Sequence, residues 1–232
     1  MRVLCDWLLT PERAALHLPS ATAVVADLHL GYDDARRRRG EAVPFCPPDE
    51  TLGRLGRALN RHGVRRLVVA GDLLEDGRCA AVPADLLRWL DRAGLELVGV
   101  VPGNHDRGPA KRGGRGAQGA RCAADPLAVA GVVVFPAGFP LGPWRVVHGD
   151  GPLPRGRLVH GHEHPCVRWA GRLVAPCYLV GGGRLILPAL SPDAAGVNVL
   201  QDRRWAPFRC CVIAGDAVLD FGRVEDLRRA TV

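Results

Sequence analysis

Five short apolar runs, each ending at a polar cluster, constrain this chain more than any other feature of its sequence. The runs cover residues 23–26, 67–70, 97–101, 144–147 and 157–159, and Asp, Asn or His residues follow each of them. The runs are apolar throughout rather than alternating, which predicts strands buried on both faces. Because ligand sites in α/β sheets form outside the carboxyl ends of the strands, we expect the polar clusters to meet at one edge.

Two segments between the first three runs carry the apolar period of a helix. Residues 47–63 place Leu52, Leu55 and Leu59 on one face, and residues 83–94 repeat the form. Each segment ends at a glycine, as helices commonly do. The alternation of strands and helices predicts βαβ units that cover a sheet.

The second half of the chain has a different pattern. Between residues 129 and 219 there are many short apolar runs, Gly and Pro turns, and little helical periodicity. We therefore predict an α/β sandwich of two sheets that forms one domain over residues 1–232. Within it, residues 107–121 have almost no apolar side chain and are expected to form a mobile basic loop, and the tail 225–232 is expected to fray.

No apolar run approaches the length of a membrane span, and residues 1–18 lack the apolar core of a signal peptide. The mean hydropathy of +0.03 is typical of a soluble protein, so we expect a cytoplasmic location and no membrane partner. The eight cysteines include no Cys-x-x-Cys pair, which favours reduced thiols over disulfides or a zinc ribbon.

The chain is basic, with a net charge of +7 and a pI near 9.3. Such a balance suggests a polyanionic partner. However, all but one of the 31 basic residues are arginine, the exception being Lys111, and a GC-rich coding sequence would give the same skew. The charge permits a nucleic-acid substrate without establishing one.

The polar clusters combine carboxylates, imidazoles and one amide, which are ligands for Mn²⁺, Fe or Zn. In chain order they are Asp27-Leu28-His29, Gly71-Asp72, Gly103-Asn104-His105-Asp106, His148-Gly149 and Gly161-His162-Glu163-His164. Residues two apart in an extended segment face the same way, so Asp27 with His29, and His162 with His164, can each deliver two ligands to one region. We expect the glycines to allow sharp turns and to keep bulk out of the site.

In this order, and each after a strand, the five motifs resemble the complete signature of the calcineurin-like metallophosphoesterases. The resemblance spans residues 27–164 and implies a four-layer α-β-β-α sandwich with its active site at the carboxyl ends of the strands. It further implies a hydrolase with two divalent metal ions, Mn²⁺ first and Fe or Zn as alternatives, that cleaves phosphoesters with a hydroxide bridging the ions.

The resemblance also assigns roles to single residues. One ion takes three side chains and the other takes three more, with one carboxylate between them: Asp27, His29 and His164 for the first, Asn104, His148 and His162 for the second, and Asp72 as the bridge. His105 binds no metal and donates a proton or a hydrogen bond to the scissile phosphate, and Asp106 orients it.

A narrower resemblance concerns the class of substrate. The segment 27–32, the basic residues up to Gly40 and Pro44, and the segment 187–190 are similar to the SbcD-related phosphoesterases, which include bacterial enzymes encoded beside a DNA ligase. This similarity implies a phosphodiesterase that acts on DNA or RNA, linked to DNA repair. The alternatives are a hydrolase of small phosphoesters such as cyclic nucleotides and, from another class, a metal-binding scaffold without catalysis.

Several residues near the motifs have competing interpretations. We expect His160 to support the site without binding metal, Glu163 to face away, and His17 and His62 to be structural. The run 36–39 is either a phosphate clamp or a solvated helix end. The loop 107–121 either closes over a nucleic-acid strand or is a disordered insertion, and the oligomeric state stays open.

Overall fold

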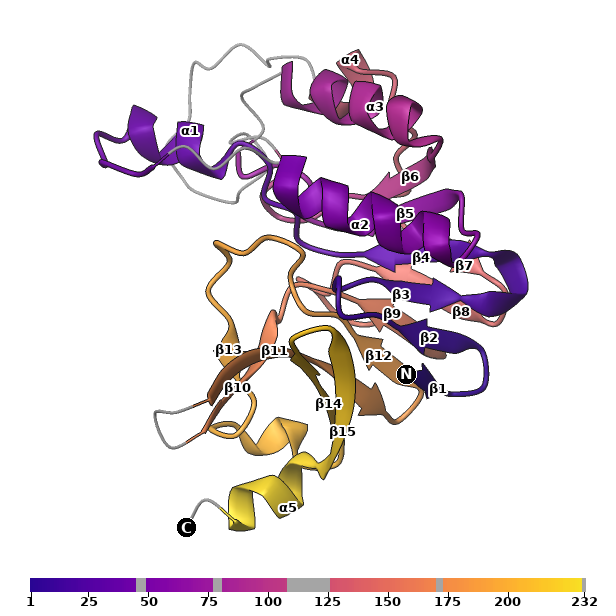
Figure 1. The fold of residues 1–232 in the computed structure, drawn as a ribbon, viewed down its shortest axis with the longest axis vertical. Coiled ribbons are helices and arrows are strands. Elements are labelled where there is room, and N and C mark those ends of the chain that lie inside the picture. Colours follow the sequence, from indigo (N-terminus) through magenta and orange to yellow (C-terminus); the bar gives the residue numbers. More distant parts are fainter. Residues whose placement is uncertain (45–48, 77–80, 108–125, 170–172, 231–232) are drawn as a thin grey trace.

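The structure is a computed structural model that describes residues 1–44, 49–76, 81–107, 126–169 and 173–230. Two mixed β-sheets are stacked face to face (Figure 1). The strands of the first sheet lie in chain order: β1 (Arg2–Val3), β2 (Trp7–Leu9), β3 (Ala15–His17), β4 (Thr22–Val25), β5 (Arg66–Ala70) and β6 (Glu96–Val101).

The strands β4, β5 and β6 pair in parallel, with Val24 opposite Val68 and Val69 opposite Val100. They correspond to the first three apolar runs. The apolar residues of β4 and β5 are buried as predicted, whereas Leu97 and Val98 of β6 are only half-buried. The antiparallel strands β1 to β3 extend this sheet on one side, where the sequence analysis assigned no strand.

The second sheet is built almost entirely from the second half of the chain, as expected. Its main path runs β13-β10-β11-β12-β9-β8-β7, and β14 and β15 extend it from β11. The strands are β7 (Phe139–Leu141), β8 (Trp144–Val147), β9 (Arg157–His160), β10 (Pro165–Trp169), β11 (Leu173–Gly181), β12 (Arg184–Ile186), β13 (Val197–Asn198), β14 (Arg209–Ala214) and β15 (Ala217–Arg223). Only the pairs β8–β9, β9–β12 and β10–β13 are parallel.

Three apolar cores separate the layers. The first lies between the first sheet and the helices α2 (Asp49–Arg61), α3 (Ala81–Ala93) and α4 (Pro126–Val129), which cover its outer face in Figure 1. The second core joins side chains of both sheets, such as Val24 and Val159. The third packs the outer face of the second sheet against the 3₁₀ turn η3 (Arg203–Trp205) and α5 (Val224–Arg229). The chain thus has the predicted four-layer order, with a thin fourth layer.

The predicted fraying of the tail is wrong for most of its length. Helix α5 continues to Arg229, because Val224 and Leu227 lie three residues apart on one face and are both buried in the third core. Another helix, α1 (Tyr32–Arg38), follows the first motif and carries the arginine run. No helix among the described residues is both long and apolar enough to span a bilayer.

The described cysteines are free thiols: Cys5 is exposed, and Cys166, Cys177, Cys210 and Cys211 are buried. Cys46, Cys79 and Cys122 lie outside the described residues, as does most of the predicted basic loop, from residue 108 onward.

Candidate metal centre

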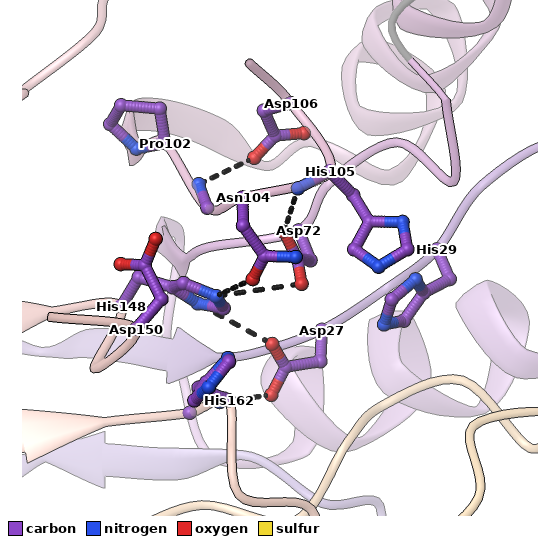
Figure 2. Close-up of polar contacts among 12 residues, drawn as sticks. Asp27, His29, Asp72, Pro102, Asn104, His105, Asp106, His148, Asp150 and His162 are labelled. Atoms are coloured by element: carbon purple, nitrogen blue, oxygen red, sulfur yellow. Dashed lines mark hydrogen bonds and ion pairs between the residues drawn. The ribbon is translucent and has the colours of Figure 1, made fainter. Parts of the chain in front are cut away.

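The five polar motifs meet at one edge of the sandwich, between the two sheets (Figure 2). Asp27, Asp72 and Asn104 follow the parallel strands of the first sheet. His148 follows β8 and His162 follows β9 of the second sheet. Because both sheets direct the carboxyl ends of these strands to the same region, residues far apart in sequence become neighbours, as predicted.

The backbone at this edge is left-handed at five predicted ligands. The φ angles are +53° at Asp27, +48° at His29, +43° at Asp72, +68° at His162 and +43° at His164. Non-glycine residues rarely adopt this region, and such strained conformations cluster at functional sites. The extended conformation predicted for these two motifs is therefore wrong, although both residue pairs do reach one centre.

Backbone pairing between the first two motifs holds this conformation. The amide of Asp27 donates to the carbonyl of Gly71 at 3.0 Å, and that of His29 donates to the carbonyl of Asp72 at 2.9 Å. Since the two loops are joined residue by residue beyond their strands, the first carboxylate and imidazole are placed beside Asp72.

One half of the centre consists of Asp27, His29 and His164, whose ligand atoms lie within 4.8 Å of one another. Oδ1 of Asp27 and the Nε2 atoms of both histidines are buried and make no hydrogen bond with the described residues. Their nearest charged contacts are longer: 3.6 Å from Oδ1 of Asp27 to Nδ1 of His148, and 3.4 Å from Nε2 of His164 to Oδ2 of Asp27. Unsatisfied buried polar atoms are costly and rare, and a cation would satisfy all three together. This donor set therefore fits a divalent metal ion.

The other half consists of Asp72, His148 and His162, again within 4.8 Å. Nε2 of His148 lies 3.1 Å from Oδ1 of Asn104 and 3.4 Å from Oδ2 of Asp72. Its Nδ1 lies 3.3 Å from the carbonyl of Ala70, so oxygen acceptors face both ring nitrogens. A neutral imidazole carries one N–H and cannot satisfy both sides, whereas a cation held by Nε2 and the neighbouring oxygens would.

Asp72 lies between the two halves. Its carboxylate groups with His148 and His162 on one side and with His29 and His105 on the other. Oδ1 accepts the backbone N–H of His105 at 2.8 Å, which fixes the carboxylate in place. This is the position that a bridging ligand requires.

The motif glycines keep space for these side chains. A Cβ atom on Gly71 would lie 1.8 Å from Nδ1 of His148, and one on Gly103 would lie 2.1 Å from Oδ1 of Asp72. A Cβ on Gly161 would lie 2.4 Å from Oδ2 of Asp27. The structure confirms that any side chain at these positions would displace a residue of the centre.

A family model described as calcineurin-like phosphoesterase matches residues 21–181, which include every motif of the centre. The chain belongs to this family. The match confirms the resemblance drawn from the motifs, and it makes the protein a metal-dependent phosphoesterase, that is, a hydrolase.

A solved structure has the same fold as this phosphoesterase. The crystal structure of the Pseudomonas putida nuclease MPE matches with a TM-score of 0.71 and 24% sequence identity, over 95% of this chain and 98% of that one. At this identity the match shows the shared fold alone. Among curated proteins, none matches the sequence significantly.

Glu75 belongs to the centre of this phosphoesterase, and the sequence analysis missed it. Its carboxylate lies 2.9 Å from Nδ1 of His29, and its backbone carbonyl lies 2.7 Å from Nδ1 of His105. Burial raises the pKa of the Glu75 carboxyl, but His29, His105 and Arg39 outweigh it and the pKa is lowered. The available signal was an acidic residue three positions after Asp72, directly after two leucines.

The same contacts act on the imidazole of His29. Burial lowers its pKa, whereas the hydrogen bond that it donates to Glu75 and the charges of Asp72 and Asp27 raise it, and the pKa is raised overall. The raised pKa shows that the nearby carboxylates outweigh burial, and such a negative surrounding also favours a bound cation.

The role predicted for Asp106 is wrong in its contacts. Its carboxylate does not hold the ring of His105 but accepts the backbone N–H groups of Gly103 and Leu74 at 2.9 Å and of Leu73 at 3.2 Å. Burial raises its pKa to about 6, against the effect of these hydrogen bonds. Asp106 thus joins the third motif to the backbone of the second. The ring of His105 instead contacts the backbone carbonyl of Glu75.

Three histidines stand outside the ligand groups. His160 is buried, its Nδ1 lies 3.1 Å from the carbonyl of Gly161, and burial lowers its pKa to about 4. His17 contacts Ser20 and packs on Trp7. His62 is exposed after α2.

Glu163 faces away from the centre, as predicted. Its two carboxylate oxygens pair with Arg204 at 3.1 and 2.7 Å. This pair attaches the turn between His162 and His164 to η3, so the ligand turn is supported from the third core.

The arginine run of α1 is mostly engaged with acidic residues. Arg36 pairs with Glu41, Arg37 lies near Asp33 and Asp34, and Arg38 pairs with Asp76 at 3.0 Å. Arg39 is exposed and close enough to Glu75 to lower the pKa of that carboxyl. That the run binds phosphate stays a hypothesis. The acidic neighbours of the other three arginines leave Arg39 as the candidate for such a contact.

Proposed function

We propose that this phosphoesterase hydrolyses phosphodiester bonds with two divalent cations held at the centre described above. The first cation is held by Asp27, His29 and His164. The second is held by Asn104, His148 and His162, and Asp72 binds both. The observation that carries the proposal is the set of buried ligand atoms on Asp27, His29 and His164 that make no hydrogen bond with the described residues.

Mn²⁺ is the ion that we propose first, because the donors are imidazole nitrogens and carboxylate or amide oxygens, without a thiolate. The same donors also suit Fe and Zn. Bound divalent cations polarise the phosphoryl group and make water a strong nucleophile at neutral pH. The remaining chemistry belongs to side chains of the chain itself.

His105 is the proposed proton donor to the leaving oxygen. The carbonyl of Glu75, 2.7 Å from Nδ1, can only accept a hydrogen bond, so Nδ1 carries a hydrogen. Nε2 is then the nitrogen that exchanges a proton with the substrate. A diester has a poor leaving group, so a proton supplied at this atom lowers the barrier to cleavage.

We propose a nucleic acid as the substrate, in a reaction linked to DNA repair. Support comes from the net charge of +7 and from the sequence similarity to phosphoesterases encoded beside a DNA ligase. The solved structure with the same fold is that of a nuclease, and this activity is known of that protein. A cytoplasmic location stays a prediction from the sequence.

The test is hydrolysis of bis(p-nitrophenyl) phosphate and p-nitrophenyl phosphate by the purified protein with added Mn²⁺. We expect turnover of the diester that requires the metal and collapses in His105→Ala and Asp72→Asn. His62→Ala, an exposed histidine outside the centre, serves as the matched control and should behave like the wild type. Absence of turnover by a wild type with both cations bound would contradict the proposal and favour a scaffold.

A further inference from the structure

A pocket of about 290 Å³ opens beside the centre. It is lined by parts of the segments 101–107, 136–138 and 145–154, and His148 forms part of its wall. Figure 2 places Asp150 and Pro102 on the side of His148, away from His105 and His29. The pocket and the metal centre therefore share a residue, and a group in the pocket lies next to a proposed metal ligand.

One wall of the pocket is built by close backbone packing on β8. Arg145 and Val147 alternate with buried residues along this strand and so point to its other face. Gly138 has a φ of +92°, and a Cβ there would lie 2.8 Å from the carbonyl of Val146 and 3.2 Å from Cγ of Arg145. The segment 136–138 can approach the strand only because this position is glycine.

The charged side chains around the pocket leave a net positive charge. Arg107 pairs with both carboxylate oxygens of Asp150, at 2.8 and 3.3 Å, and donates to the carbonyl of Pro102. These two charges cancel. Arg145 is exposed and makes no ion pair with any residue that the structure describes. The pocket thus carries one uncompensated guanidinium, a group suited to bidentate phosphate contacts.

We infer that this pocket binds the nucleoside joined to the reacting phosphate, and that Arg145 binds the next phosphate along the chain. The inference rests on the proposed phosphodiesterase function. The volume of about 290 Å³ lies just below the range of about 300–1,000 Å³ for ligand pockets, so the pocket admits no more than a single nucleoside unit. A guanidinium without an ion-pair partner at such a pocket favours a substrate that carries a second phosphate over an ester without one.

The residues that line the pocket also determine how the base of the nucleoside is recognised. Among the described residues that line the pocket there is no Phe, Tyr or Trp, and Pro102, Pro136, Pro152 and Pro154 contribute flat apolar surface instead. Stacking on aromatic rings is therefore absent from this wall, and the recognised feature is the sugar-phosphate chain. The subsite accepts any of the common bases.

The experiment measures binding of thymidine 3′,5′-bisphosphate and thymidine 5′-monophosphate to the Mn²⁺-loaded protein by calorimetry. We expect the wild type to prefer the bisphosphate, and Arg145→Ala to reduce that preference about tenfold, as for loss of one charge-assisted hydrogen bond. Ala137→Trp, at an exposed position that lines the pocket, should weaken both ligands. Arg66→Ala, an exposed arginine at the far end of β5, is the matched control.

An unchanged preference in Arg145→Ala would overturn the inference, and so would unchanged affinity in a folded Ala137→Trp. This readout requires no catalysis. Loss of the proposed function would appear separately, as absence of bis(p-nitrophenyl) phosphate turnover in the wild type, so the two failures are distinguishable.

Discussion

The carboxylate of Glu75 lies 2.9 Å from Nδ1 of His29, and both groups are buried. The contact fixes the hydrogen on Nδ1 and directs the unpartnered Nε2 of His29 toward the cluster of ligand atoms. The backbone of the same residue supports His105. Glu75 thus connects a proposed metal ligand to the proposed proton donor.

Removing this carboxylate should weaken metal binding. We expect Glu75→Ala to reduce Mn²⁺ affinity by about 10- to 100-fold, the usual effect of losing a carboxylate behind a metal-binding histidine. Glu75→Gln should lose less, because its amide oxygen can still accept from Nδ1. Calorimetric titration with Mn²⁺ measures the change, and Glu96→Gln, an exposed acid on β6, is the control. Equal affinity in Glu75→Ala and wild type would refute this role.

A single methyl group at Gly103 should disrupt the centre. Its Cβ would lie 2.1 Å from Oδ1 of Asp72, so the carboxylate must move. We expect Gly103→Ala to lose diesterase activity by roughly 100-fold, since misplacing a reacting group by about 1 Å costs that much. Steady-state kinetics measure this loss.

Gly53→Ala on helix α2 is the matched control for that change. Among the described side chains beyond its chain neighbours, the end of Arg57 alone would come within 4 Å of the new Cβ, at 3.5 Å. Activity should persist, and the protein should gain roughly 0.5–1 kcal/mol of unfolding free energy, because alanine favours helices. A fully active Gly103→Ala would contradict the described packing.

Asp106→Asn distinguishes the observed role of this residue from the one predicted. Its carboxylate accepts three backbone N–H groups, and an amide NH₂ cannot accept. We expect the free energy of unfolding to fall by about 2 kcal/mol, as for buried donors left unpaired. Urea denaturation of the metal-free protein measures it. Unchanged stability together with a shifted pH–rate profile would instead favour direct orientation of His105.

Arg13 should support the centre from a distance. Its Nη1 lies 3.0 Å from the carbonyl of Ala189 and 2.9 Å from that of Ser191, whose amide donates to the carbonyl of Asp27. We expect Arg13→Met to lower the unfolding free energy by about 1.5–3 kcal/mol through loss of charged hydrogen bonds. Thermal denaturation checks this, with Arg66→Ala as an exposed control. A melting temperature equal to that of the wild type would contradict it.

The meeting of the motifs was predictable because neighbouring parallel strands end at the same edge of a sheet. Asp27, Asp72 and Asn104 could thus be grouped from the ends of their apolar runs. The left-handed backbone at Asp72 could not be predicted, since periodicity reports only regular structure. The turn at Asp72 brings Glu75 into contact with His29 and His105, so Glu75 was not predicted to belong to the site.

Other differences arise from packing between distant segments. Strands β1 to β3 are only two or three residues long and carry no readable alternation. Helix α5 is six residues long and rich in charge, and it is held by Val224 and Leu227 in a core supplied by other strands. Asp106 adjoins His105 in sequence, yet its side chain turns to the amides of another loop.

The most direct test of the central claim is the number of Mn²⁺ ions that each chain binds, measured by inductively coupled plasma mass spectrometry after equilibrium dialysis. We expect two ions per chain in the wild type and in His62→Ala. Asp27→Ala and His148→Ala should each bind fewer, since each loses a ligand of a different ion. A wild type that binds no Mn²⁺, Fe or Zn, or variants that retain two ions with unchanged affinity, would contradict the account.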